Sequence, residues 1–181
     1  MSEFEFLAVL LSIVFGLALT QTLAGGVRLL FDDEIDYERM GWTLCLVTTF
    51  VVNWWGFFGW SDRDAWTFAT YTFLMLWAIG HYVLAVSLFP QTLGKAIDPE
   101  MGERIFLIVF LLLMPLDVIE GLVRGNLFDV PLYLPAMAHW TLLLLYRLLS
   151  RPRQIVARAI AWYMFVSILV WALFARRMLV T

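Results

Sequence analysis

Long apolar segments separated by short polar ones run through the whole chain. Six segments carry few or no charges, and they cover residues 6–30, 42–60, 66–89, 105–123, 131–149 and 155–174. An α-helix rises about 1.5 Å per residue, so about 20 apolar residues cross a hydrocarbon core of about 30 Å. The pattern predicts an all-α, polytopic integral membrane helix bundle with about six transmembrane helices, forming a single domain over residues 1–181.

Composition agrees with this class and excludes several others. Of the 181 residues, 62% are hydrophobic and 15% are charged, whereas soluble domains are about half apolar and about a quarter charged. The net charge of −3 provides no basic surface for nucleic acid. The single cysteine, Cys45, excludes an internal disulfide. Because the chain lacks HExxH, GxSxG and phosphate-loop motifs, we expect no enzymatic activity.

The basic residues between the segments predict an orientation. The connections after the first, third and fifth segments hold Arg28, Arg39, Lys95, Arg104, Arg147, Arg151, Arg153 and Arg158. The opposite face holds only Arg63, Arg124, Arg176 and Arg177. Because basic residues favour the cytoplasmic side, we expect a bacterial inner membrane protein with both termini outside the cytoplasm. The hairpin that carries Arg147, Arg151, Arg153 and Arg158 is then expected to contact anionic lipid of the inner leaflet.

Small residues recur every four positions in the first segment. They are Ala8, Ser12, Gly16, Thr20 and Ala24. One interpretation is close helix packing, within one copy or between copies of a homo-oligomer. The other is a narrow polar path along this helix, lined by Ser12, Gly16, Thr20 and Gln21.

The fourth segment contains the charges that are most costly in lipid. Asp117, Glu120 and Arg124 follow Pro115 on one helix face, and the spacing of four residues predicts an ion pair between Glu120 and Arg124. Asp117 lies seven residues before Arg124, or about 10 Å deeper in the membrane than Arg124. His139 is expected at a similar depth in the fifth segment. The two residues are predicted to meet, either to fix helix packing or to pass a proton or cation.

His81 in the third segment raises a further alternative. Two histidines on separate membrane helices can ligate one b-type haem, so His81 and His139 are candidate axial ligands. A histidine that is simply hydrogen-bonded within the bundle is the other interpretation. Apart from this haem alternative, no cofactor or metal is expected.

Part of the first segment, Val14-Phe15-Gly16-Leu17-Ala18-Leu19-Thr20, resembles the corresponding helix of the prokaryotic relatives of the lysosomal potassium channel. Ile79-Gly80 and Leu113-Met114-Pro115-Leu116 are similar too. The resemblance implies a six-helix subunit that forms a tetramer, with the first helix lining a cation pore. The Arg-x-x-x-Phe-Ser-Asp signature of that family is not preserved, and only Ser12 corresponds to it, so the resemblance implies no filter residue.

These observations predict an oligomeric subunit that conducts or transports a cation or proton. The candidate residues of the route are Ser12, Gly16, Thr20, Gln21, Asp117, Glu120 and His139. Two alternatives from other classes stay open. One is a non-conducting membrane anchor or sensor subunit of a larger complex, and the other is an electron-transfer subunit with b-type haem.

Overall fold

The computed structural model describes residues 2–61, 63, 65–90, 98–125, 127–128 and 132–178. This part of the chain is all-helical, as predicted. Its helices are α1 (Glu3–Leu29), α2 (Tyr37–Phe57), the short 3-10 helix η1 (Phe58–Trp60), α3 (Phe68–Leu88), α4 (Pro99–Arg124), α5 (Tyr133–Ser150) and α6 (Gln154–Met178).

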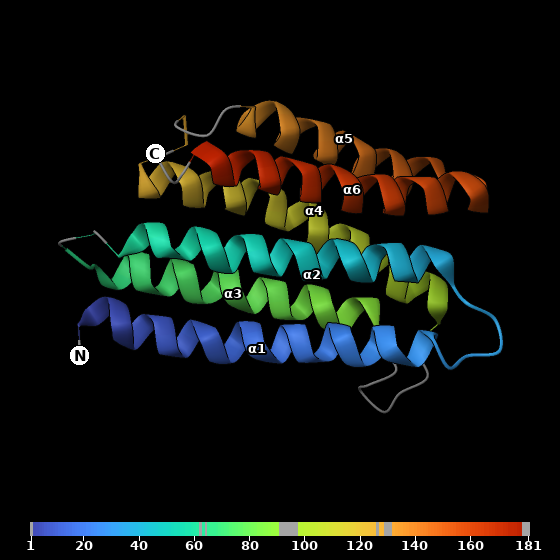
Figure 1. Cartoon of the computed structure of the whole chain (residues 1–181), viewed down its shortest axis with the longest axis horizontal. Coiled ribbons are helices and arrows are strands. Elements are labelled where there is room, and N and C mark those ends of the chain that lie inside the picture. The colour runs from blue at the N-terminus through green and yellow to red at the C-terminus, as the bar shows by residue number, and fades with distance from the viewer. Residues whose placement is uncertain are drawn as a thin grey trace.

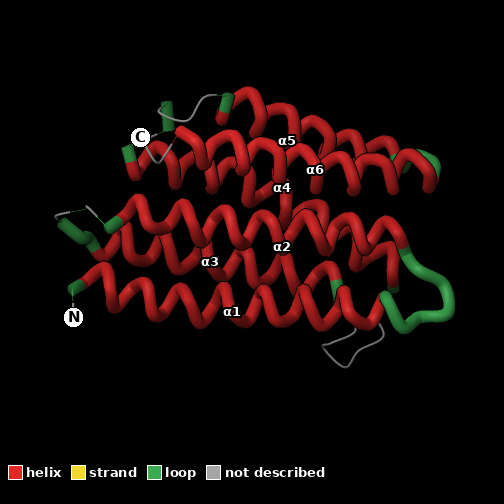
Figure 2. The backbone as a smooth tube through the Cα atoms, in the orientation of Figure 1, coloured by secondary structure: helices red, strands yellow, loops and turns green. Residues whose placement is uncertain are grey.

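The six α-helices lie side by side along the long axis of the molecule and alternate in direction (Figure 1). α1, α2 and α3 form one group, and α4, α5 and α6 form the other. The groups meet where α2 packs on α6 and α3 packs on α4. Figure 2 shows that the described connections are short, apart from the loop between α1 and α2. α1 begins and α6 ends at the same end of the bundle, which we call the terminal end; the other is the loop end.

Five of these helices are long and apolar enough to cross a membrane: Glu3–Leu29, Tyr37–Trp60, Phe68–Leu88, Glu100–Arg124 and Gln154–Phe174. The 18 residues of α5 fall outside this set. The reason lies in its composition, because Pro135, His139 and Arg147 interrupt its apolar residues. Length and composition therefore indicate an integral membrane protein, whereas the count of six crossings stays a prediction.

The helix ends differ from the apolar segments because polar caps extend the helices. Ser2 and Glu5 form a capping box at the start of α1. Asp36 caps α2 and Asp98 caps α4 by accepting hydrogen bonds from free backbone N–H groups. α4 ends at Gly125, whose φ of 90° is the left-handed conformation that glycine adopts without strain. The apolar segment identifies the part of each helix that can lie in hydrocarbon, whereas the polar caps set the residues at which the helix begins and ends.

Small residues bring the helices close together at the loop end. A Cβ atom added to Gly41 of α2 would lie 3.0 Å from the Cβ of Ala161 in α6. A Cβ on Gly26 of α1 would lie 2.7 Å from Thr43 of α2. At these positions a larger side chain would push the helices apart, so glycine permits the backbones to approach.

Three aromatic rings fill the interior between α2 and α4. The ring centroids of Trp42 and Phe106 are 5.3 Å apart, and those of Phe106 and Phe110 are 5.8 Å apart. Trp42 also contacts Phe110, at 6.3 Å. Each of the three side chains is 1% exposed or less. This ring cluster separates the two cavities described next.

Candidate functional site

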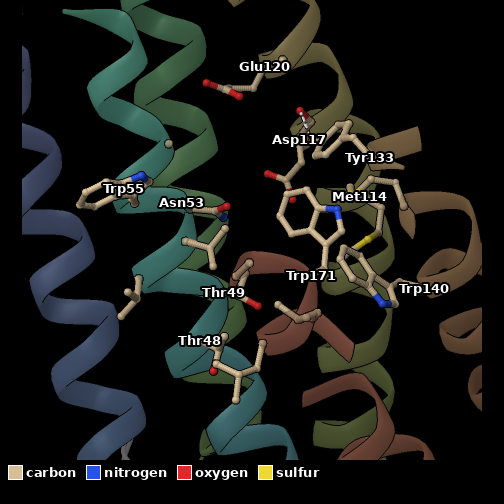
Figure 3. A pocket seen from close by; sticks show the side chains of 18 of the residues that line it. Thr48, Thr49, Asn53, Trp55, Met114, Asp117, Glu120, Tyr133, Trp140 and Trp171 are labelled. Atoms are coloured by element: carbon tan, nitrogen blue, oxygen red, sulfur yellow. Dashed lines mark hydrogen bonds between the residues drawn. The ribbon is translucent and has the colours of Figure 1, made fainter. Parts of the chain in front are cut away.

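A cavity of about 860 Å³ opens in the half of the bundle nearer the terminal end. Its walls come from the second halves of α2, α4 and α6 and from the first half of α5. Figure 3 shows Thr48, Thr49 and Asn53 on the α2 side, opposite side chains from α4, α5 and α6, with the ring of Trp55 on the other side of α2. Most of the wall is apolar or aromatic. We call this space the Asp117 cavity after the carboxylate on its wall.

Asp117 is held by only one of its two oxygens. The indole Nε1 of Trp77 in α3 donates a hydrogen bond of 2.6 Å to Asp117 Oδ1. This bond joins the side chains of α3 and α4. Among the described residues, no donor or cation pairs with Oδ2, and the side chain lines the cavity. One carboxylate oxygen of Asp117 therefore faces open space within the bundle.

Glu120, one turn further along α4, has a different environment. Trp60 Nε1 donates a 2.5 Å hydrogen bond to Glu120 Oε1, and Arg124 forms an ion pair with Oε2 at 3.6 Å. Arg124 also donates to the backbone carbonyl of Gly56. The predicted Glu120–Arg124 ion pair is confirmed. Because Arg124 compensates Glu120, the charge on Asp117 is left without a cationic partner within the described chain.

A chain of hydrogen bonds leads from α2 through α3 to Asp117. His81 Nδ1 lies 2.8 Å from the carbonyl oxygen of Trp77, which can only accept, so Nδ1 carries the proton. His81 Nε2 is then the acceptor for the Asn53 amide, at 2.7 Å. The side chain of Trp77 continues the chain to Asp117. The first two bonds hold the His81 ring between α2 and the backbone of Trp77, and the indole bond positions the carboxylate.

Aromatic side chains from α5 and α6 form the opposite wall. The ring centroid of Trp171 lies 5.6 Å from that of Tyr133 and 5.8 Å from that of Trp140. Tyr133 also donates from its hydroxyl to the backbone carbonyl of Asp117, at 3.0 Å. Figure 3 shows Trp171 and Tyr133 beside Asp117, with Trp140 behind them. Aromatic rings therefore form the side of the cavity that lies next to Asp117.

A second cavity, of about 380 Å³, lies toward the loop end. Its lining is rich in charged residues, and Glu38, Glu103 and Arg147 are among them. Arg147 bonds to Glu38 at 2.9 Å and also pairs with Glu103. Trp42 and Phe106 line this second cavity, whereas Phe110 lines the Asp117 cavity. The ring cluster therefore stands between the two cavities.

The predicted contact between Asp117 and His139 is wrong. Asp117 bonds to Trp77, whereas His139 Nε2 bonds to the Tyr163 hydroxyl at 2.9 Å on the exposed side of α5 and α6. The helical rise placed the two residues at a similar depth. Rotation about the helix axis separates them, because α5 turns Met137 and Trp140 toward the cavity and His139 away from it.

The haem alternative does not fit the structure either. Both ring nitrogens of His81 already have hydrogen-bond partners within the bundle. Its ring packs against Phe15, Phe50 and Trp77 at centroid distances of 5.4, 6.0 and 4.8 Å, and its side chain is 1% exposed. His139 is bound to Tyr163 on the outer surface. The two histidines therefore do not face a common space that a porphyrin could occupy.

The small residues of α1 lie on the outside of the bundle. Ser12, Gly16 and Thr20 are exposed, and a Cβ on Gly16 would meet nothing within 4 Å. Ser12 donates to the carbonyl of Ala8 in its own helix. Neither cavity is lined by these residues or by Gln21. Within one copy of the chain they form no path, so their predicted role in a pore would require other copies.

The basic residues predicted to contact lipid do not behave alike. Arg147 is 11% exposed and is bound to two glutamates, so little of its side chain is available to lipid. Arg151 and Arg153 are exposed, whereas Arg158 is half-buried and its guanidinium lies 6.0 Å from the ring centre of Tyr37. Lys95 and the side chains of Arg176 and Arg177 lie outside the described residues.

Sequence reasoning did not identify Trp77, Trp60 and Asn53 as parts of the site. A comparison of the depths of polar groups along α3 and α4 would have identified Trp77 as a partner of Asp117. It lies nine residues, or about 14 Å, from the start of α3, and Asp117 lies about 10 Å from the end of α4 at the same end of the bundle. An indole N–H is one of the few donors in an apolar helix that can satisfy a carboxylate at such a depth.

Comparison with protein-family models, with curated proteins and with solved structures found no match. The resemblance to the prokaryotic relatives of the lysosomal potassium channel therefore stays a prediction.

Proposed function

We propose that this chain is a membrane transport protein that moves a cation through its own helix bundle, with Asp117 as the group that binds the charge. The observation that carries the proposal is the free Oδ2 of Asp117 on the wall of an 860 Å³ cavity between membrane helices. An ionisable group within a transmembrane segment is costly and commonly marks the path of an ion or proton. The role is one of binding and transport, without catalysis.

The contrast between the two carboxylates supports a role for Asp117 beyond holding the helices together. Glu120 has a cationic partner in Arg124, as expected for a structural group. Asp117 has a hydrogen bond that positions it but no cation. A cationic substrate or a proton would compensate the charge of Asp117. If the substrate and the proton bind to this carboxylate in turn, transport of one would be coupled to transport of the other.

The two cavities on opposite sides of the ring cluster fit a transport path with a closed barrier. The Asp117 cavity lies nearer the terminal end, and the cavity with Arg147 lies nearer the loop end. Trp42, Phe106 and Phe110 fill the space between them. Transport would require these rings to move, as in alternating access around a central site.

The direction of α5 supports the six-crossing topology that the sequence predicts. α4 ends at the terminal end and α6 begins at the loop end, so α5 has to cover the same thickness between them (Figure 1). Its 18 residues span about 27 Å, close to the hydrocarbon thickness. The same topology places the basic residues of the α5–α6 hairpin at the loop end. We propose that this end faces the cytoplasm of a bacterial cell.

Self-association through α1 also stays a prediction. The exposed face with Ser12, Gly16 and Thr20 is free to pack against a second copy, as that prediction requires. The proposed path through each bundle does not depend on the number of copies.

Proteoliposomes test the proposal. We expect wild-type protein to carry at least one member of a panel of H⁺, Na⁺, K⁺ and tetraphenylphosphonium, and Asp117→Asn to reduce that flux at least tenfold. Asparagine keeps an acceptor for Trp77, so the fold is preserved. Asp33→Asn in the exposed α1–α2 loop is the matched control and should leave the flux unchanged. Equal flux in Asp117→Asn would refute the role of Asp117, and absence of wild-type flux would favour the anchor or sensor subunit.

A further inference from the structure

We infer that the cation is organic, with a hydrophobic and largely aromatic body, and that it reaches the Asp117 cavity from the lipid. This inference rests on the proposed function and names the substrate class of the same site. Four properties of the cavity carry it: its volume, its few free oxygens, its aromatic walls and its exposed rim.

The volume is that of a pocket for a drug-sized molecule. Cavities that enclose such ligands measure about 300–1,000 Å³, and the Asp117 cavity has about 860 Å³. A proton or a dehydrated metal ion would leave nearly all of this space empty. A molecule with two to four rings would occupy it.

The oxygens on the wall are too few to replace the water around an inorganic cation. Hard cations such as Ca²⁺ take about six to eight oxygen ligands. The hydroxyls of Thr48 and Thr49 donate to carbonyls of their own helix, at 2.9 Å each. Glu120 is already paired with Arg124. No cluster of three or more metal-binding side chains occurs in the described part of the chain. A single free carboxylate oxygen suits a single diffuse positive charge.

The aromatic walls supply the attraction for a cation that the few free oxygens do not. Trp77 and Tyr133 contact Asp117 directly by hydrogen bonds, and Trp171 packs against Tyr133. Trp55 of α2 also lines this cavity, at its exposed rim. A cation attracts the negative face of an aromatic ring, and the attraction increases where water is excluded. The carboxylate would set the position of the charge, and the rings would hold the body of the ligand.

The rim of the cavity faces the membrane. Val51 and Trp55 of α2 and Phe58 of η1 line the cavity and are 58%, 48% and 55% exposed. Leu173 of α6 lines it as well and is 57% exposed. In a bilayer these side chains meet hydrocarbon, which a hydrated ion does not enter. A hydrophobic cation partitions into the membrane and reaches the cavity between α2 and α6.

Binding of tetraphenylphosphonium to purified protein in nanodiscs tests the inference, with neutral triphenylphosphine oxide as the uncharged probe. We expect saturable tetraphenylphosphonium binding by calorimetry that weakens about tenfold or more in Asp117→Asn, since removing the charge partner removes the main attraction. Trp55→Leu should weaken binding about threefold to tenfold through loss of a ring. Trp162→Leu, a tryptophan outside the cavity, is the matched control and should not change it. Binding of the uncharged probe should not distinguish wild type from Asp117→Asn.

The outcomes separate this inference from the proposed function. Asp117-dependent flux of H⁺, Na⁺ or K⁺ that tetraphenylphosphonium neither shares nor inhibits would overturn the organic cation and leave the transport proposal standing. Flux that is identical in wild type and Asp117→Asn would overturn the transport proposal. Tetraphenylphosphonium binding that is unchanged by both Asp117→Asn and Trp55→Leu would overturn the assignment of the cavity as its site.

Discussion

The hydrogen bond between Trp77 and Asp117 joins α3 to α4 and positions the carboxylate of the proposed site. Trp77→Phe removes the N–H donor and keeps an aromatic ring in contact with Phe15 and His81. Because phenylalanine is smaller, this variant also loses packing. A double-mutant cycle with Asp117→Leu, which removes the acceptor, separates the hydrogen bond from the packing loss.

The expected magnitude follows from the chemistry of the bond. The acceptor is a carboxylate, and hydrogen bonds to charged groups contribute about 1.5–3 kcal/mol. Neutral side-chain bonds between membrane helices average about 0.6 kcal/mol. We therefore expect a coupling free energy of about 1.5–3 kcal/mol, which corresponds to a change of about 10- to 150-fold in the unfolding equilibrium.

Reversible unfolding of the four proteins in mixed micelles, at increasing fractions of denaturing detergent, measures this coupling. Trp162→Phe is the reference for a neutral indole bond, because Trp162 donates to the backbone carbonyl of Tyr37 at 3.0 Å. We expect this reference to lose about 0.5–1.5 kcal/mol. A Trp77–Asp117 coupling below about 0.6 kcal/mol would contradict the reasoning, because the bond would then be no stronger than a neutral one.

Two further predictions concern helix packing and the barrier. Gly41→Leu should lower the free energy of unfolding by about 1–3 kcal/mol, because the new side chain would meet Ala161 of α6. Gly16→Leu lies on the exposed face of α1 and should change the free energy of unfolding of the monomer little. Equal effects in the two variants, measured by the same detergent unfolding, would contradict the α2–α6 contact. Phe106→Leu should increase tetraphenylphosphonium leak from proteoliposomes, because it removes a ring between the two cavities. Unchanged leak would mean that the path does not pass the ring cluster.

The helices could be predicted closely because lipid imposes one requirement on every crossing segment. Each predicted segment coincides with an observed helix, and the ends differ by a few residues. The largest difference is at α4, which begins at Pro99 instead of near Ile105 because Asp98 caps it ahead of the apolar residues. The Glu120–Arg124 pair could be predicted for a similar reason, since both residues lie on one helix and their spacing decides whether they meet.

The partner of Asp117 could not be predicted in this way. Depth in the membrane follows from the helical rise, which predicts similar levels for Asp117 and His139. Contact also requires that two helices turn the same faces toward one another. Each residue rotates the direction of its side chain by about 100°, so His139 and its neighbour Trp140 point to different surroundings.

The sequence alone determined that this chain is a bundle of apolar helices with two carboxylates placed where hydrocarbon would penalise them, because these properties depend only on the order of residues along each helix. Only the tertiary structure decided that Asp117 is held by Trp77 and faces a cavity, and that His81 and His139 have other hydrogen-bond partners. The rotation and neighbours of each helix arise from the packing of all side chains together. No single segment contains that information.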